Sequence, residues 1–440
     1  MGHPAICFSR KRISGRAGVQ MKSRLGLVCF LMLSSTLCAQ GIPSLTTAQW
    51  TQDLEYFANE IATHHRDPYH LVPKARFDAE VAELRGRIPS MKDYEIVVGL
   101  QRLAASIGDG HTFVDTGMLY GAVPTAVPIE VFWFGDELRV VRAAPEYSRA
   151  LGTRIVAVGS TPISGVRRRL QQLIPQGESE WFVMDKSARL ITEIEPLAAL
   201  QIIPYGDTAS FTFETDAGRR FTLALRAEPP GRSTAMVMLG DRVPLPFQHP
   251  EDPLWFTYLP DSQTVYVDFR SFQNLEQETK PLWDFIAQHS PKRLIVDMRW
   301  NIGGNYMHGR EYLVSKIIFL PQLNRAGRLF VITGRRTFSA AMTNVTDFRR
   351  ETEATLVGEP TGARPNGYQE NHWFTLPNSH IRVSCATLKY RFQPFRDSAG
   401  VFPDDRVDPD WKAVRAGGDA AIDWILRQPL PDDGPSRAAP

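Results

Sequence analysis

The segments RLIVDMRWNIGGN (residues 293–305) and RLFVITGRRTFSAAM (residues 328–342) decide the fold of this chain. Each begins with a short apolar run that lacks polar alternation, which is typical of a strand buried on both faces of a parallel sheet. The second run is followed by a turn and then by a predicted helix over residues 340–350. Alternating strands and helices of this kind predict an α/β sheet, whose functional sites lie at the carboxyl ends of the strands.

Two features of the turns after these strands indicate chemistry. The adjacent Gly303 and Gly304 permit a sharp turn and expose backbone N–H groups. Ser339 falls at the predicted start of the helix, where unpaired N–H groups and the positive end of the helix dipole favour an oxyanion. Two interpretations of Ser339 remain open from local spacing: it is a nucleophile, or it is a helix N-cap, a position that serine often occupies.

These motifs resemble those of the tail-specific, or C-terminal processing, serine peptidase family, whose relatives include the tricorn core protease and interphotoreceptor retinoid-binding protein. Residues 297–304 match its Asp-Leu-Arg-x-Asn-x-Gly-Gly segment, and residues 337–342 match Thr-x-Ser-Ala-Ala-Glu, except that Met342 replaces the Glu. The resemblance implies a mixed α+β chain. It would contain a ClpP/crotonase-like α/β catalytic domain, an N-terminal helical cap and a PDZ-like β-rich middle domain.

A candidate base follows the last of three predicted N-terminal helices. His111 lies in Gly108-Asp109-Gly110-His111-Thr112, a tight turn on which it is either a hydrogen-bonded turn residue or a base facing a cleft. The resemblance implies the second role, because the tricorn-like branch takes its base from an Asp-x-His-Thr segment. The processing branch uses a Lys instead, and Arg364 occupies that neighbourhood here. Arginine does not lose its proton at working pH, so Ser–His chemistry is implied.

A third group must fix the tautomer of the histidine. In the tricorn-like branch a Ser precedes the His, and a Glu in a Val-Glu-Pro-Asp segment completes the network; Gly110 and Asp408 stand at these places here. Asp408, Glu370 and Asp109 are all candidates, and a surface role is the alternative for each. His372 is an alternative base.

The resemblance implies a serine-type peptidase, in which His111 takes the proton of Ser339 and an acyl-enzyme forms on a polypeptide substrate. The N–H groups of Ala340 and of Gly303 or Gly304 would hold the oxyanion. A catalytically inactive protein that binds a peptide or a small apolar ligand is the alternative, as the retinoid-binding relatives illustrate.

No metal and no organic cofactor is expected, because no HExxH, Walker or dinucleotide-binding pattern occurs in a suitable context. His64, His65 and His70 lie close together in the sequence. We expect packing or surface roles for them, because no acidic or cysteine partner shares their spacing.

Composition excludes some classes of protein. The 440 residues carry a formal net charge of +2, and 43% are hydrophobic, so neither a nucleic-acid surface nor a polyanionic substrate is indicated. Residues 21–41 have a short positive region and an apolar run that predict a cleaved signal peptide, with residues 1–20 as an upstream extension. Cleavage after Cys38 leaves Cys385 as the single cysteine, and we expect a periplasmic or secreted protein.

Three domains are expected after the signal peptide. They are a helical cap over residues 42–117, a PDZ-like domain over 118–243 and a peptidase domain over 254–428, followed by a disordered tail at 429–440. Residues 150–163 resemble the carboxylate-binding loop and hairpin of a PDZ-like domain, which binds a peptide at a sheet edge. The alternative is a β-subdomain that only supports the cleft.

Overall fold

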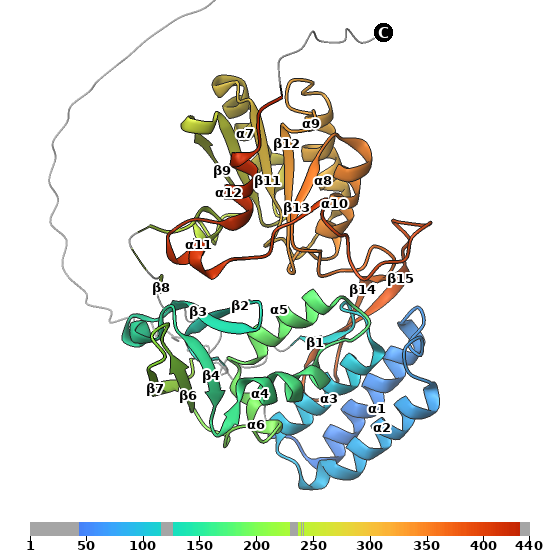
Figure 1. The fold of residues 1–440 in the computed structure, drawn as a ribbon. Helices are drawn as coiled ribbons and strands as arrows, with labels where there is room; N and C mark the ends of the chain where they lie inside the picture. Colours follow the sequence, from blue (N-terminus) through green and yellow to red (C-terminus); the bar gives the residue numbers. More distant parts are fainter. Residues whose placement is uncertain (1–43, 116–125, 229–235, 239, 241, 432–440) are drawn as a thin grey trace, which may run out of the picture. The chain divides into compact units, whose positions relative to one another are not determined.

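The computed structural model describes residues 44–115, 126–228, 236–238, 240 and 242–431, all within one compact unit that begins at Ala39. Figure 1 shows a mixed α+β chain, as the resemblance implied. The predicted extension (1–20), the signal peptide (21–41) and most of the predicted tail (432–440) lie outside the described residues. Among the described helices, none combines the length and apolar character that a membrane crossing requires.

A six-stranded sheet carries the motifs that open the sequence analysis. Its order is β16 (Asp405–Arg406), β13 (Thr355–Gly358), β12 (Leu329–Thr333), β11 (Arg293–Asp297), β10 (Thr264–Phe269) and β9 (Leu254–Leu259). All neighbours pair in parallel except β9, which runs antiparallel to β10. Strands β11 and β12, which the opening segments predict, are therefore adjacent and parallel. The turns that follow them lie at the same edge of the sheet. The sequence analysis missed β9.

Helices cover both faces of this sheet. Val265 and Val267 share a core with α7 (Leu275–His289) and α10 (Ala340–Glu351), whereas Tyr266 between them packs with α12 (Ala420–Arg427). Every residue of β11 and β12 is buried, as expected for central parallel strands. This half of the chain also contains four short helical segments. They are α8 (Tyr306–Gly309), a π-helical turn (Arg310–Val314), α9 (Ser315–Ile318) and α11 (Trp411–Arg415).

The predicted N-terminal helices are α1 (Thr47–His64), α2 (Lys74–Arg87) and α3 (Asp93–Ile107). Residues 88–90 form a 3-10 turn between α2 and α3. The Glu95 carboxylate accepts the N–H of Lys92 at 2.7 Å and so fixes the start of the helix there.

A three-stranded sheet joins these helices to the C-terminal half of the chain. Its order is β1 (Phe113–Asp115), β15 (Arg382–Lys389) and β14 (Tyr368–Thr375). Phe374 and Val383 of the hairpin share a hydrophobic core with Trp50, Phe57 and Leu100 of the helices. The apolar face of the hairpin therefore packs on the N-terminal helices, and β1 extends the edge of the hairpin.

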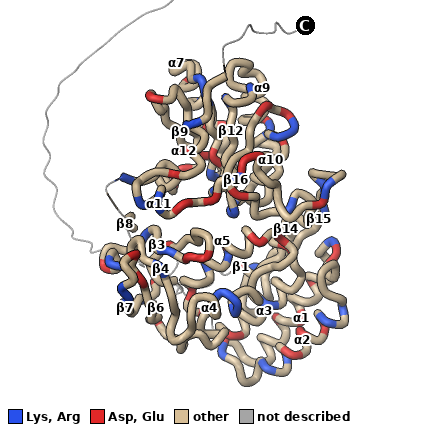
Figure 2. The backbone as a smooth tube through the Cα atoms, viewed as in Figure 1, with Lys and Arg blue, Asp and Glu red and all other residues tan. Residues whose placement is uncertain are grey.

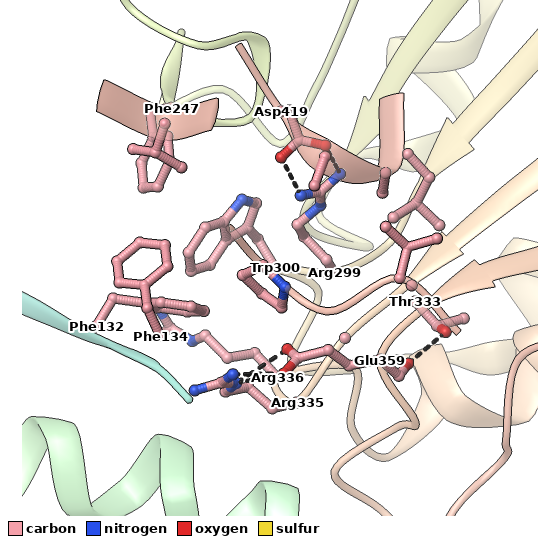
Figure 3. A pocket seen from close by; sticks show the side chains of 18 residues that line it. Phe132, Phe134, Phe247, Arg299, Trp300, Thr333, Arg335, Arg336, Glu359 and Asp419 are labelled. Atoms are coloured by element: carbon pink, nitrogen blue, oxygen red, sulfur yellow. Dashed lines mark hydrogen bonds and ion pairs between the residues drawn. The ribbon is translucent and has the colours of Figure 1, made fainter. Parts of the chain in front are cut away.

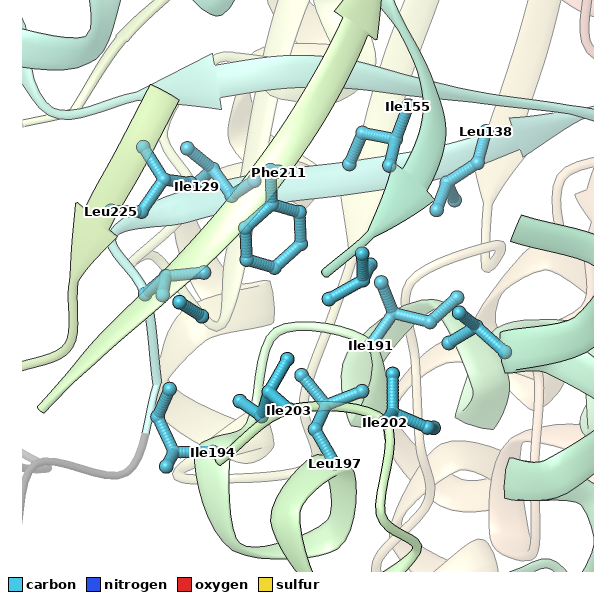
Figure 4. Close-up of a cluster of buried hydrophobic side chains, with 14 of the residues drawn as sticks. Ile129, Leu138, Ile155, Ile191, Ile194, Leu197, Ile202, Ile203, Phe211 and Leu225 are labelled. Atoms are coloured by element: carbon cyan, nitrogen blue, oxygen red, sulfur yellow. The ribbon is translucent and has the colours of Figure 1, made fainter. Parts of the chain in front are cut away.

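The middle of the chain forms a β-rich sheet with its own core (Figure 4). Its main strands follow the order β2 (Ile129–Phe134), β3 (Glu137–Ala143), β4 (Arg154–Val158), β6 (Thr208–Glu214) and β7 (Arg220–Arg226), with β5 (Thr161–Pro162) on β4 and β8 (Val237–Met238) on β3. The helices α4 (Ile163–Leu170), α5 (Glu180–Leu190) and α6 (Ile194–Ala199) belong to this part. The predicted hairpin is present as β4–β5, and the PDZ-like identity stays a prediction.

Charges of both signs are interspersed over the described elements (Figure 2). This distribution agrees with the nearly balanced formal charge of +2.

Candidate active site

Ser339 lies between the turn after β12 and the first residue of α10. Its backbone has φ 51° and ψ −126°, a conformation that is costly for a residue with a Cβ and that indicates a functional constraint. Its side chain makes no capping hydrogen bond to the helix. The hydroxyl is therefore available for another role, and the side chain is partly exposed.

The neighbouring strand turn holds Ser339 in this conformation. The N–H of Phe338 donates to the carbonyl of Asn301 at 3.1 Å, and Thr337 Oγ1 donates to the carbonyl of Met298 at 2.9 Å. A Cβ on Gly303, whose φ is 112°, would lie 2.6 Å from the Cβ of Ser339. Only glycine permits this approach of the two turns.

The imidazole of His111 contacts the Ser339 hydroxyl. His111 Nε2 lies 2.9 Å from Ser339 Oγ, although the two residues are 228 positions apart in the sequence. This is the hydrogen-bond geometry required between a nucleophile and its base. A neutral ring that accepts the hydroxyl proton at Nε2 carries its own proton on Nδ1.

Burial lowers the pKa of His111 to about 4, while the nearby carboxylates of Asp109 and Glu370 act to raise it. The ring is therefore neutral at pH 7, which is the form that can accept a proton. Its Nδ1 is buried without a hydrogen bond of good geometry, but the backbone carbonyl of Tyr368 is close enough to raise the pKa.

A buried carboxylate shapes the turn that carries His111. Asp109 Oδ1 accepts the backbone N–H of His111 at 3.1 Å, and Oδ2 accepts Thr112 Oγ1 at 3.0 Å. His65 Nε2 also lies 2.8 Å from Oδ2; its Nδ1 accepts the N–H of Asp67, so Nε2 donates to the carboxylate. Asp109 therefore positions the backbone of the turn and does not hold the imidazole proton.

The β14–β15 hairpin fixes the other side of the turn. Ser384 Oγ donates to the carbonyl of His111 at 2.8 Å, and Asn371 Nδ2 donates to Ser384 Oγ at 2.5 Å. The sequence analysis missed both residues, because the pairing of β15 with β1, which brings the hairpin to the His111 turn, joins segments far apart in the sequence.

Phe338 occupies the space beside the imidazole. Its ring stacks on His111 with centroids 4.8 Å apart, and Phe182 stacks on Phe338 at 5.2 Å. A Cβ on Gly110 would lie 2.6 Å from the Phe338 ring and 3.0 Å from that of Phe182. Phe338 thus explains why a glycine stands where the resembled family has a serine.

The predicted orienting carboxylates differ in their surroundings. Asp408 is exposed and pairs with Arg406 at 2.9 Å, which corresponds to the surface role that the sequence analysis gave as the alternative. Glu370 acts on the pKa of His111 through its charge, but its Oε1 accepts the hydroxyl of Tyr390. The alternative base His372 lies against His64 and Glu60.

Two of the three predicted oxyanion donors have free N–H groups. The N–H of Gly303 already donates to Asn301 Oδ1 at 2.9 Å. Within the described part of the chain, the N–H groups of Gly304 and Ala340 have no acceptor. A Cβ on Gly303 would lie 2.6 Å from the Cβ of Ser339 and 3.2 Å from the backbone nitrogen of Ala340, so the Gly303 turn lies against the start of the helix.

Glu178 links the His111 turn to the loop that contains Arg364. Its two carboxylate oxygens accept the backbone N–H groups of Gly110 at 2.9 Å and Arg364 at 3.2 Å. Desolvation raises the pKa of Glu178 to about 7. The Arg364 side chain donates to the carbonyl of Gly177 at 3.0 Å, so it supports the loop.

Two pockets flank the site. One of about 470 Å³ lies beside Gly108 and Asp109 and is lined by charged side chains that include Glu178 and Arg364; its volume is in the range of ligand pockets. The other encloses about 40 Å³ between the aromatic residues Phe132, Phe134, Phe247 and Trp300 (Figure 3). Arg335 and Glu359 pair at its wall. It has room for little more than one or two waters, so we interpret it as a packed junction.

Comparisons with known proteins bear on the fold. No protein-family model matches the chain, and no curated protein matches it. The structure of mature CPAF complexed with lactacystin matches with a TM-score of 0.58 at 10% identity, covering 86% of this chain and 97% of that one. Mature CPAF alone gives a TM-score of 0.57 at 10% identity, with coverages of 86% and 96%.

The photosystem II D1 C-terminal processing protease also matches, with a TM-score of 0.39 at 16% identity and coverages of 84% and 98%. The chain shares its fold with mature CPAF over most of both lengths. The resemblance found in the motifs is thus confirmed at the level of the fold.

Proposed function

We propose that this chain is a serine-type peptidase of the tail-specific family, with Ser339 as its nucleophile and His111 as its general base. The observation that carries the proposal is the 2.9 Å contact between His111 Nε2 and Ser339 Oγ. The strained backbone of Ser339, its uncapped hydroxyl and the shared fold with mature CPAF support the same conclusion.

The reaction begins when Ser339 Oγ attacks the carbonyl carbon of a peptide bond and its proton passes to His111 Nε2. The N–H groups of Ala340 and Gly304 then stabilise the oxyanion, and one such donor typically contributes about two to three powers of ten in rate. His111 returns the proton to the leaving amine, and an acyl-enzyme remains on Ser339. A water that loses its proton to His111 then hydrolyses this ester.

The arrangement differs from a complete triad, because no carboxylate among the described residues hydrogen-bonds His111 Nδ1. We propose that the Tyr368 carbonyl fixes the tautomer, with Asp109 and Glu370 stabilising the imidazolium through their charge. A neutral carbonyl stabilises the cation less than a carboxylate would, so a modest turnover is expected.

An inactive binding protein is the second candidate. Met342, which stands where the resembled family has a Glu, is fully buried in the core and cannot perform polar chemistry. The pairing of Ser339 with His111 favours the peptidase over this alternative.

Hydrolysis of casein or of a peptide library by the wild type, Ser339→Ala, His111→Gln and Ser210→Ala tests the proposal. Ser210 is exposed on β6 and serves as the control. Both site variants are expected to lose at least about a thousandfold in kcat/KM, whereas Ser210→Ala keeps full activity. Equal hydrolysis by Ser339→Ala and the wild type would exclude the assigned nucleophile.

We also propose that the enzyme acts in the periplasm or outside the cell. The positive and apolar pattern of residues 21–41 and the lone Cys385 of the mature chain support this location. N-terminal sequencing of the protein from cell fractions tests it; an intact residue 21–41 segment on a cytoplasmic protein would contradict it.

A further inference from the structure

Three residues with metal-binding side chains meet where helix α1 lies against strand β14. Glu60 and His64 lie four residues apart in α1 and therefore on one helix face. His372 of β14 lies against them, and one ligand atom from each of the three residues lies within 4.8 Å of the others. The sequence analysis overlooked Glu60 as the acidic partner of His64.

The distances between these atoms fit a shared ion better than direct hydrogen bonds. Glu60 Oε2 lies 3.4 Å from His64 Nε2 and 3.5 Å from His372 Nε2. Hydrogen bonds between nitrogen and oxygen are about 2.7–3.2 Å long. Two ligands of a tetrahedral zinc ion, with bonds of about 2.0–2.1 Å, lie about 3.3–3.4 Å apart.

A second observation concerns His372 itself. Its Nε2 is a buried atom without a hydrogen-bond partner, although the rest of the ring is partly exposed. A buried nitrogen without a partner costs free energy. A metal ion would satisfy this nitrogen and the Glu60 oxygen together.

The two imidazoles must adjust to share an ion. Their rings stack with centroids 4.0 Å apart and planes at 22°, so at least one ring must rotate to direct its lone pair at a common point. His64 has room for this rotation, because its side chain is 40% exposed.

We propose that Glu60, His64 and His372 form a site for a divalent transition metal ion of the Zn²⁺ class. Two imidazole nitrogens and one carboxylate oxygen form a ligand set that suits zinc, and a water would complete the tetrahedron. Mg²⁺ and Ca²⁺ prefer oxygen ligands, so this site disfavours them.

The site would connect the two elements that hold the His111 turn. His65, directly after His64, donates to Asp109 in that turn, and Asn371, directly before His372, donates to the serine that holds the His111 carbonyl. An ion bound by residues of α1 and β14 would therefore hold together the two elements that support the His111 turn. The inference concerns metal binding and does not depend on the proposed peptidase activity.

Titration of the untagged, chelator-treated chain with Zn²⁺ by calorimetry, and with Co²⁺ by visible absorption, tests the site. We expect one Zn²⁺ per chain and tetrahedral Co²⁺ bands. His64→Ala, His372→Ala and Glu60→Gln are each expected to weaken binding at least about tenfold. The control is His249→Ala, which removes an exposed histidine that also faces a carboxylate, that of Asp252 at 3.2 Å, but has no third ligand.

Thermal unfolding provides a readout independent of activity. Saturating Zn²⁺ should raise the unfolding midpoint of the wild type and of His249→Ala by about 2 °C or more. The midpoints of the three site variants should not change with Zn²⁺. Mg²⁺ should not raise the midpoint of any of these proteins. Absence of stoichiometric Zn²⁺ binding to the folded wild type would overturn the inference. Binding that survives in all three variants would overturn it as well.

Discussion

The Ser339 hydroxyl is free to react because its side chain does not cap the helix that it begins. The sequence left the nucleophile and the N-cap interpretations equally open, since both place a serine between a strand and a helix. The side chain makes no capping hydrogen bond, and the backbone φ of 51° and the contact with His111 support the nucleophile that we propose. That contact joins two distant segments, so local spacing could not reveal it, and only the resemblance to a family indicated it.

The low pKa of His111 predicts the pH dependence of activity. Because burial lowers this pKa to about 4, the ring is already neutral well below pH 7. The kcat/KM for a neutral peptide should rise with pH through about 4 and stay level towards neutrality. A pH profile measured between 3 and 8 checks this, and an inflection near the ordinary histidine value of 6.5 would contradict the buried position of the ring.

The low pKa of His111 also predicts how the folding stability depends on pH. The dependence has the opposite direction to that of a salt-bridged histidine, whose pKa is raised by folding. Between about pH 6.5 and 4 the unfolded chain binds a proton at His111 that the folded chain does not, so folding stability falls as the pH falls through this window. The loss is up to about 1.4 kcal/mol per pH unit. Urea unfolding at pH 7 and pH 4.5 should show a smaller decrease for His111→Gln than for the wild type.

The residue that orients the imidazole could not be predicted from the sequence. Asp408 matched the motif position, but its side chain is exposed and pairs with Arg406. The backbone of Tyr368 acts to raise the pKa of His111, and a backbone interaction leaves no signature in residue type. His65, which supports the turn through Asp109, was assigned to packing for a similar reason.

Among the elements, the central strands and their helices could be predicted from the apolar pattern of the sequence. A strand that is buried on both faces requires a continuous apolar run. Strands β11 (Arg293–Asp297) and β12 (Leu329–Thr333) lie within the two apolar runs from which strands were predicted. The partner of the β14–β15 hairpin was not predictable, since its apolar face would suit any neighbouring core. It packs on the N-terminal helices and thereby reaches the His111 turn.

Removal of the Ser384 hydroxyl tests whether the hairpin supports the His111 turn. Ser384→Ala removes the buried hydrogen bond to the His111 carbonyl and is expected to cost about 1–2 kcal/mol of stability. It should also lower kcat about tenfold, because the imidazole loses part of its support, while the pH of half-maximal kcat/KM stays unchanged. Thr387→Ala, at the far end of the same strand, is the control; an equal effect of both variants would exclude a specific role for Ser384.

On the scale of the whole described chain, a buried ion pair connects the β-rich sheet to the six-stranded sheet. Arg335 pairs with Glu359 through Nε at 2.9 Å, and its Nη1 donates to the carbonyl of Trp133 in β2 at 3.0 Å. Both side chains are nearly fully buried. The turn that leads to Ser339 is therefore fixed to the edge strand of the middle region.

Arg335→Met should destabilise the chain by about 3–5 kcal/mol, because the Glu359 carboxylate would stay buried without a partner. Urea unfolding measures the loss, and the double variant with Glu359→Leu should recover much of it. Lys74→Met, which breaks an exposed pair with Asp78, is the control and should leave the unfolding midpoint nearly unchanged. A single-variant loss no larger than that of the control would show that the pair does not hold the two sheets together.

The most direct measurement of the central claim is labelling by a fluorophosphonate, which forms a covalent ester only with a serine activated by a base. Mass spectrometry of the labelled and digested protein should find one adduct, on Ser339, and labelling should disappear in His111→Gln although that variant remains folded. An unlabelled wild-type protein, or an adduct that forms equally without His111, would contradict the proposed Ser339–His111 pair.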